Sequence, residues 1–303
     1  MRVVVLGGAG FIGSHCVDEL ISKTADVLVI DNLSTGLRSS INPSACFSVL
    51  DVCEPELRNA VSDWGRPDAV VVLAAQTSVT RSCTEPLEDA RTNILGLINV
   101  VELCLQLGVP YILFSSSAAV YGEPERLPIS EMHMTNPRSP YAVSKFAGEL
   151  YLKSIAQSAG VTTCIMRFSN VYGPRQRSDG EAGVVSIFAD QFARSNRVTV
   201  YGDGSQTRDF IYVADVVTAM LRAIEKGASG LFNISTNTST SVLDLYRTMG
   251  DIMEHQAPID FRPARQGDIL HSRLDNRRAI EALDWRPRTD LRKGLEHTIA
   301  SLR

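Results

Sequence analysis

Seven short apolar segments in the first 234 residues constrain the fold of this chain more than any other feature. Each is a nearly continuous run of Val, Ile and Leu, which is typical of strands that are covered on both faces. Longer segments of helical periodicity lie between them, for example 12–22, 91–107 and 141–158. This alternation predicts an α/β fold with a doubly wound parallel sheet. The expected strands are 2–6, 27–30, 46–50, 69–73, 111–114, 162–166 and 231–234.

The rhythm of strands and helices weakens after residue 166, and residues 241–303 contain short helical segments with a Pro- and Arg-rich connection. We therefore expect a large sheet domain with a smaller C-terminal lobe of mixed α/β structure. The expected sheet domain comprises residues 1–167 and about 207–235, and the lobe comprises about 168–206 and 236–303.

The overall composition excludes several classes of protein. With 303 residues, 44% hydrophobic and 21% charged, the chain has the composition of a soluble globular protein with a sizeable core. Its net charge of -4 provides no general attraction for nucleic acid or an anionic membrane. The first apolar run is too short for a signal sequence or a membrane span. The six cysteines form no C-x-x-C pair and no metal-site spacing with the histidines, so we expect no metal and a cytoplasmic location.

A glycine-rich turn follows the first expected strand and opens a helix. Gly7, Gly10 and Gly13 give the spacing G-x-x-G-x-x-G. Small residues allow a pyrophosphate to approach the backbone, and the helix N-terminus stabilises its charge. The alternative is a tight structural turn, but the strand–glycine–helix context favours a Rossmann-type dinucleotide site.

Asp31 ends the second expected strand, where an acidic side chain would bind the ribose hydroxyls of the adenosine. The alternative for this residue is an Asx turn at the strand end. No arginine follows that could hold a 2'-phosphate, so the sequence favours NAD over NADP. Asp51 and Val52, after the third strand, are further candidates for contact with the adenine.

Tyr141 and Lys145 are four residues apart on an expected helix, and Ser115 to Ser117 precede them. Residues i and i+4 share a helix face, so the lysine ammonium is expected beside the phenol. A neighbouring positive charge favours a phenolate, which can act as a general base. Taken alone, the pair could equally be an ordinary surface pair on an amphipathic helix.

Motifs over essentially the whole chain resemble those of the extended short-chain dehydrogenases/reductases, and most closely the UDP-hexose 4-epimerases. These motifs are 7–13, 31–36, 73–76, 115–122, 141–145, 170–174, 208–213, 265–268 and 283–287.

The resemblance implies a role for each matching residue. Tyr141 would be the acid/base, Lys145 would bind the nicotinamide ribose and keep Tyr141 acidic, and Ser117 would relay the proton of the sugar hydroxyl. Arg208 and Arg265 would hold the diphosphate, although each could instead be a solvated surface charge. The other implied substrate contacts are Asn170, Tyr201 and Asp268, together with Ser117 and Tyr141. The implied cofactor contacts are Gly7, Gly10, Phe11, Ile12, Gly13, Asp31, Asn32, Ser34, Thr35, Gly36, Asp51, Val52, Leu73, Ala74, Ala75, Gln76, Asn93, Ser115, Tyr141 and Lys145.

Three positions depart from the patterns of these relatives. Val72 stands where many have a histidine, Gln76-Thr77-Ser78 where the galactose-type epimerases have a lysine that reaches the cofactor, and Ser272 where some have a bulky aromatic residue. The cofactor is therefore expected to be held less tightly or by other groups. The sugar pocket is expected to have room for an N-acetyl group.

The residues beside Ser117 discriminate between the reactions of this family. Sugar dehydratases typically have Asp-Glu at this place and decarboxylases often have Glu, whereas this chain has Ala118-Ala119. Without a carboxyl group there, an elimination has no evident proton carrier. The resemblance therefore implies NAD-dependent 4-epimerisation of a UDP-hexose. A dehydratase, decarboxylase or reductase is the alternative, and a non-catalytic dinucleotide-binding regulator is a second one.

Relatives commonly form homodimers through the helices that correspond to 91–107 and 141–158. The apolar residues of the first of these helices could form the interface or belong to the core. They are Leu95, Val101, Leu103 and Leu105.

Overall fold

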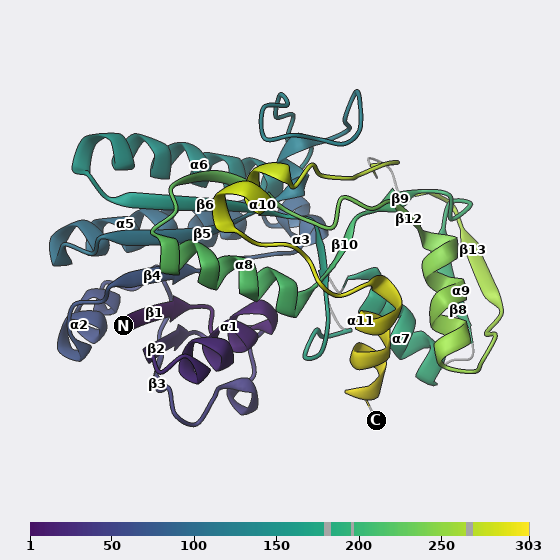
Figure 1. The fold of residues 1–303 in the computed structure, drawn as a ribbon, viewed down its shortest axis with the longest axis horizontal. Coiled ribbons are helices and arrows are strands. Elements are labelled where there is room, and N and C mark those ends of the chain that lie inside the picture. Colours follow the sequence, from purple (N-terminus) through teal and green to yellow (C-terminus); the bar gives the residue numbers. More distant parts are fainter. Residues whose placement is uncertain (179–182, 195–196, 265–268, 303) are drawn as a thin grey trace.

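The computed structural model describes residues 1–178, 183–194, 197–264 and 269–302. Its centre is a seven-stranded sheet in the order β11-β6-β5-β4-β1-β2-β3 (Figure 1). All neighbouring strands are parallel. The seven strands are β1 (Arg2–Leu6), β2 (Asp26–Asp31), β3 (Cys46–Val49), β4 (Ala69–Val72), β5 (Tyr111–Ser117), β6 (Thr162–Phe168) and β11 (Gly230–Ile234). The expected doubly wound sheet and its seven strands are confirmed.

Alternate residues of the strands face two separate hydrophobic cores, as the continuous apolar runs require. On one face, Val3 and Val5 of β1 pack with α1 (Phe11–Ser22), α8 (Val213–Lys226) and α10 (Arg277–Leu283). On the other face, Val4 and Leu6 pack with α2 (Glu56–Trp64), α5 (Gly96–Leu107) and α6 (Pro140–Ala159). Strands β2 and β3 lie on one side of β1, and β4, β5, β6 and β11 lie on the other, so β1 and β4 form the switch point at which such sheets bind ligands.

A smaller lobe has a third hydrophobic core and lies on the right in Figure 1. It contains α7 (Val184–Arg194), α9 (Val242–Ile252), α11 (Leu291–Ala300), and the parallel pair β8 (Val198–Tyr201) and β13 (Ile259–Arg262). Two further strand pairs are β7 (Asn170–Tyr172) with β10 (Phe210–Tyr212), and β9 (Thr207–Arg208) with β12 (Thr240–Ser241). The domain boundaries stay a prediction, and α10, expected in the lobe, packs in the core of the sheet.

The remaining elements are short. They are η1 (Arg38–Ser40), α3 (Val79–Thr84), α4 (Pro86–Ala90), η2 (Arg91–Leu95) and η3 (Ala118–Tyr121).

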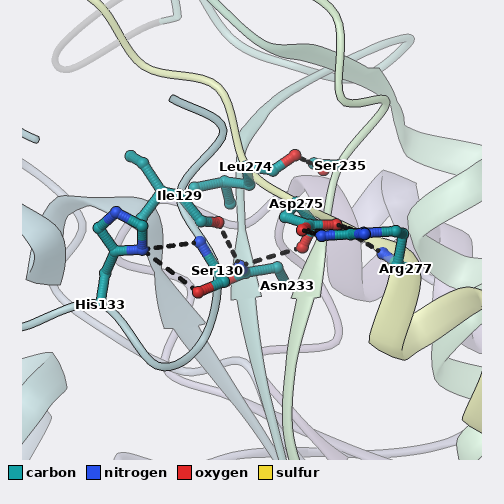
Figure 2. Close-up of polar contacts among 8 residues, drawn as sticks. All are labelled: Ile129, Ser130, His133, Asn233, Ser235, Leu274, Asp275 and Arg277. Carbon is teal, nitrogen blue, oxygen red and sulfur yellow. Dashed lines mark hydrogen bonds and ion pairs between the residues drawn. The ribbon is translucent and has the colours of Figure 1, made fainter. Parts of the chain in front are cut away.

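Buried polar side chains join the lobe segments to the end of the sheet. Asp209, fully buried, accepts hydrogen bonds from the backbone amides of Thr236, Asn237 and Leu274. Figure 2 shows Asn233, at the end of β11, between two segments that are far apart in the sequence. Its side-chain amide donates to the carbonyl oxygens of Ile129, at 2.9 Å, and Asp275, at 3.2 Å. These bonds fix residues 129 and 274–275 over the carboxyl end of β11.

None of the helices in the described ranges has the length and apolar character needed to cross a membrane. The described residues also include no group of three His, Cys, Asp or Glu side chains that could hold a metal ion.

Candidate active site

The glycine turn between β1 and α1 has the backbone that its sequence predicts. Gly7 has a positive φ of 82°, and a Cβ atom there would lie 2.6 Å from the backbone nitrogen of Ala74. A Cβ atom on Gly13 would overlap the carbonyl oxygen of Gly7. These two glycines therefore let the turn, the start of α1 and the end of β4 pack against one another.

The N-terminus of α1 fits a bound anion. Gly10 caps the helix without a side-chain hydrogen bond, and the first turn has no acidic residue. A Cβ atom on Gly10 would meet only the Gly7 oxygen within 4 Å, at 3.3 Å. The first amides of α1 and the positive end of its dipole thus face open space, as a pyrophosphate requires.

Asp31 connects this turn to the end of β2. Its Oδ2 accepts a hydrogen bond from the amide of Ala9 at 2.9 Å, and its Oδ1 accepts one from the amide of Leu33 at 2.8 Å. Asp31 therefore forms the Asx turn that was its alternative interpretation. The same carboxylate also lies beside the glycine turn, where a ribose is expected. Leu33 adopts a positive φ of 58° directly after it.

The residues after β2 and β3 form the expected adenine side of the site. The side-chain amide of Asn32 donates to Asp51 Oδ2 at 2.7 Å. Although burial raises the pKa of Asp51, hydrogen bonds from Cys53 and Asn32 bring it below its ordinary value. The side chain of Val52 belongs to the core with α2 and α5, and a contact of this residue with the adenine stays a prediction. Gly36 is buried against Ala9, whereas Ser34 and Thr35 are exposed.

Residues 173–178, which follow β7, cross back to this side of the molecule. Arg175 forms an ion pair with Asp18 of α1 at 2.6 Å, and the carbonyl oxygen of Pro174 lies 2.9 Å from His15 Nε2. Arg177 donates to the carbonyl oxygen of Thr35 at 3.3 Å. The segment thus links the chain beyond β7 to α1 and to the loop after β2.

The loop after β4 and the turn η2 share a hydrogen-bond network. The amide of Gln76 donates to Asn93 Oδ1 at 2.8 Å, and Asn93 Nδ2 donates to the carbonyl oxygen of Gln76 at 2.9 Å. Asn93 Nδ2 also donates to Ser144 Oγ on α6 at 3.0 Å. The turn η2 is a π-helix, a feature that often marks functional positions and here directs Asn93 inward, where it is buried. Leu73 and Ala74 continue β4, each donating its amide to the carbonyl oxygen of Leu6.

Strand β5 extends three residues beyond its expected end and includes all three serines, because β6 continues beside it to Phe168. Helix α6 begins at Pro140, with Ser139 as its N-cap. The structure thereby brings Ser115, Ser117, Tyr141 and Lys145 together, although they come from different elements. Lys145 Nζ donates to the carbonyl oxygen of Ser115 at 2.9 Å, and Ser117 lies close enough to Tyr141 for its hydroxyl to lower the pKa of the phenol.

Burial shifts the pKa values of this pair. Burial raises the pKa of Tyr141 to about 12; the hydrogen bond with Ser117 acts in the opposite direction, and the charge of Asp89 adds to the rise. Burial lowers the pKa of Lys145 to about 8, which the charge of Asp89 opposes. Lys145 is not among the groups that lower the pKa of Tyr141 here, and its expected action on Tyr141 stays a prediction. The ammonium points to Ser115 and lies 6.0 Å from the centre of the Tyr141 ring.

The expected substrate residues lie on the short strands of the lobe side. Asn170 is exposed at the start of β7, and its amide donates to the carbonyl oxygen of Asp209. Arg208 is half-buried on β9, and its guanidinium donates to the carbonyl oxygen of Thr207 at 2.9 Å. Tyr201 ends β8 and is 37% exposed. Arg265 and Asp268 lie outside the described residues.

Comparison with known proteins identifies the family. The model of the NAD-dependent epimerase/dehydratase family matches residues 3–235. The chain belongs to this family. A relative from Methanocaldococcus jannaschii, a putative UDP-glucose 4-epimerase, is 41% identical over 98% of this chain and 97% of its own length. A UDP-glucuronic acid decarboxylase from Arabidopsis thaliana is 34% identical over 100% of this chain and 70% of its own length.

A solved structure is also closely similar. The UDP-glucose 4-epimerase of Thermotoga maritima, crystallised with UDP-glucose, matches 100% of this chain and 99% of its own, with a TM-score of 0.97 and 41% identity. The seven-stranded fold is thus that of this member of the epimerase/dehydratase family.

The network contains two residues that the sequence interpretation missed. Asp89, on α4, accepts hydrogen bonds from Gln76 Nε2 at 3.0 Å and Asn93 Nδ2 at 3.1 Å. Ser144, next to Lys145, receives the third bond of Asn93. The spacing of Asp89 and Asn93 by four residues on a helical segment was the available signal for Asp89.

Proposed function

We propose that this chain catalyses the NAD-dependent 4-epimerisation of a UDP-hexose, such as UDP-glucose and UDP-galactose, through a transient 4-keto sugar. The observation that carries this proposal is the proximity of Ser117 and Tyr141, with Lys145 anchored on Ser115 beside them. Together these residues form a relay that can remove and return one hydroxyl proton.

The glycine turn, the free N-terminus of α1 and Asp31 fit a dinucleotide, and we assign NAD to this site. NAD supplies the acceptor and the donor of the hydride. The protein's own residues move the proton. Ser117 binds the sugar 4-hydroxyl and passes its proton to Tyr141, and the same groups return the proton after the keto sugar has rotated in the site. The ammonium of Lys145 stabilises the negative charge on Tyr141 during each transfer.

The alternative reactions of the family need an additional acid or base near the sugar. Ala118 and Ala119 follow Ser117 directly and form the start of η3, where neither side chain can carry a proton. Decarboxylation is included in the test below because the decarboxylase relative matches the whole of this chain. The proposed pocket also includes Asn170, Tyr201, Arg208, Arg265 and Asp268, and the small side chain of Ser272 favours acceptance of N-acetylhexosamines.

The test is a panel of four substrates with proton NMR of the product: UDP-glucose, UDP-galactose, UDP-N-acetylglucosamine and UDP-glucuronic acid. We expect inversion at C4 and no accumulation of a keto sugar. Release of carbon dioxide from UDP-glucuronic acid, or a stable keto sugar, would overturn the proposal. Tyr141→Phe is expected to abolish turnover while NAD remains bound. Tyr151→Phe, an exposed tyrosine on the same helix, is the matched control and should retain it.

We also propose a cytoplasmic homodimer that forms through α5 and α6. Leu95, Leu105, Val143 and Leu150 are all exposed on this side, which supports a covered apolar face. Val101 and Leu103 are buried in the sheet core, so their place in the expected interface is corrected. Leu150→Glu should yield a monomer in light scattering, and an unchanged mass of the wild-type and variant proteins would contradict this interface.

A further inference from the structure

One buried carboxylate beside the proposed catalytic residues has no part in the reaction described above. Asp89 is 1% exposed, on the five-residue helix α4. Both of its hydrogen bonds end on Oδ1, and both donors are side-chain amides, from Gln76 at 3.0 Å and Asn93 at 3.1 Å. Because burial of an ionised carboxylate is costly, the charge calls for a compensating partner.

The usual structural roles of a buried aspartate do not account for Asp89. Its carboxylate accepts no hydrogen bond from a backbone amide of the described residues, so it does not cap a helix or a turn there. Within the same residues, it makes no ion pair. If hydrogen bonding to the two amides were its whole purpose, an asparagine would serve equally well, since the amide oxygen could accept both bonds.

A buried positive charge in the neighbouring helix α6 belongs to Lys145. Lys145 is also buried, 3% exposed, and its ammonium donates a hydrogen bond to the neutral carbonyl oxygen of Ser115. Phe114 covers it, with the ring centre 5.0 Å from Nζ. Helices α4 and α6 pack against each other, so the two buried charges are held in neighbouring elements. Asp89 acts on Lys145 and on Tyr141 through its charge.

We propose that Asp89 is a positioning residue of the active site, whose buried negative charge keeps Lys145 in its ammonium form while its carboxylate orients Asn93 and Gln76. The assignment rests on the proposed epimerase reaction, in which the ammonium must stabilise the charge on Tyr141. Asn93 reaches α6 through Ser144, so the same carboxylate also fixes the loop after β4 against the catalytic helix.

The other charged and titratable groups around α6 are occupied elsewhere. Arg81 on α3 pairs with Glu85, Arg167 on β6 pairs with Glu149 of α6 itself, and Tyr121 on η3 donates to Asn233. Arg91 on η2 acts on Asp51, Tyr111 on β5 donates to Ala228, and Glu102 on α5 is exposed. Among the described charged groups, Asp89 is thus the one that acts on the Lys145 ammonium.

The test compares the pH dependence of kcat for the full-length enzyme with bound NAD. Asp89→Asn removes the charge but retains an acceptor for both amides. Because the charge holds protons on both Lys145 and Tyr141, we expect both limbs of the profile to move to lower pH, by on the order of one unit. Glu88→Gln, which removes the same charge from the exposed neighbour on α4, should leave the profile in place.

A merely structural role would lower the rate at every pH and leave both limbs where they are, and this result would overturn the proposal. An equal displacement in Glu88→Gln would do the same, since the effect would then come from net charge. The second measurement needs no turnover: the absorbance of the Tyr141 phenolate is titrated with Tyr141→Phe as the blank. If the wild type fails to epimerise but Asp89→Asn lowers this titration point, the charge assignment stands and only the reaction is wrong.

Discussion

A buried ion pair between Glu149 of α6 and Arg167 of β6 predicts a large loss of stability when one partner is removed. Arg167 Nε donates to Glu149 Oε1 at 2.8 Å, and Arg167 Nη2 donates to Oε2 at 2.5 Å. The side chains are only 3% and 6% exposed. Glu149 also accepts a hydrogen bond from Ser116, and the guanidinium of Arg167 lies over the ring of Tyr121. The pair therefore supports β5 directly beneath Ser117.

In Arg167→Met the chain retains an aliphatic side chain, but Glu149 keeps a buried charge without its partner. Removal of one member of such a pair costs about 3–5 kcal/mol, whereas replacement of both by apolar residues is often nearly neutral. A loss of about 4 kcal/mol lowers the urea midpoint by on the order of 1 M. The double variant Arg167→Met/Glu149→Met should therefore recover most of the stability that the single variant loses.

The assay is equilibrium unfolding in urea, followed by circular dichroism with NAD at a fixed saturating concentration. Arg81→Met is the control, because the Arg81–Glu85 pair has similar geometry at 2.8 Å but is 54% and 49% exposed. An exposed pair contributes about 0.2–1 kcal/mol. If Arg167→Met loses no more stability than Arg81→Met, or if the double variant is as unstable as the single one, the reasoning from burial is refuted.

Three further predictions concern the cofactor and the catalytic lysine. Gly13→Ala should weaken NAD binding by about tenfold or more, equivalent to about 1.4 kcal/mol. The reason is that the new Cβ would overlap the Gly7 oxygen and lie 2.8 Å from Gly8 Cα. An unchanged affinity in calorimetry would contradict this. Arg175→Gln should speed NAD release, measured by stopped-flow fluorescence, about two- to fivefold, because a half-exposed ion pair is lost. Arg81→Gln should leave the release rate unchanged. The free energy of unfolding of the wild type should rise with pH, and Lys145→Met should abolish this rise. The folded-state pKa of about 8 lies below the ordinary 10.5, so the unfolded chain binds more protons between these values and wild-type stability increases there. Parallel urea midpoints of the two proteins over this range would refute it.

The sheet could be predicted from the sequence because its strands are buried on both faces. Runs such as Val3 to Leu6 are apolar at every residue, and helices cover both faces of the sheet that they form. The lobe was less predictable. Its strand pairs have two to four residues, and their partners are far apart in the chain, as with Thr207 and Ser241. Such pairs depend on tertiary contacts and leave no periodic pattern.

Within the site, spacing located side chains but gave no account of their environment. Ser117, Tyr141 and Lys145 could be identified because the family motif retains all three. The π-helix at 91–95 could not, since it has no residue signature. For Asp89 the four-residue spacing from Asn93 was the one signal, and it is weak because an aspartate in a short helix is usually solvated. The effect of burial on the pKa of Tyr141 could not be predicted, because sequence spacing contains no information on desolvation.

The order of the two pKa values places a requirement on the catalytic pair. With Lys145 at about 8 and Tyr141 at about 12, rising pH removes the proton from the lysine before it removes one from the tyrosine. A phenolate beside an ammonium is therefore not the state that these two residues favour alone. Tyr141 can act as a base near neutral pH only if the site contains additional positive charge. The nicotinamide of the oxidised cofactor would supply such a charge, whereas that of the reduced cofactor would not. Tyr141 would then be a stronger acid with the oxidised cofactor, when the sugar is about to be oxidised. It would be a weaker acid with the reduced cofactor, when the sugar hydroxyl must be restored, and a reversible epimerisation requires this alternation.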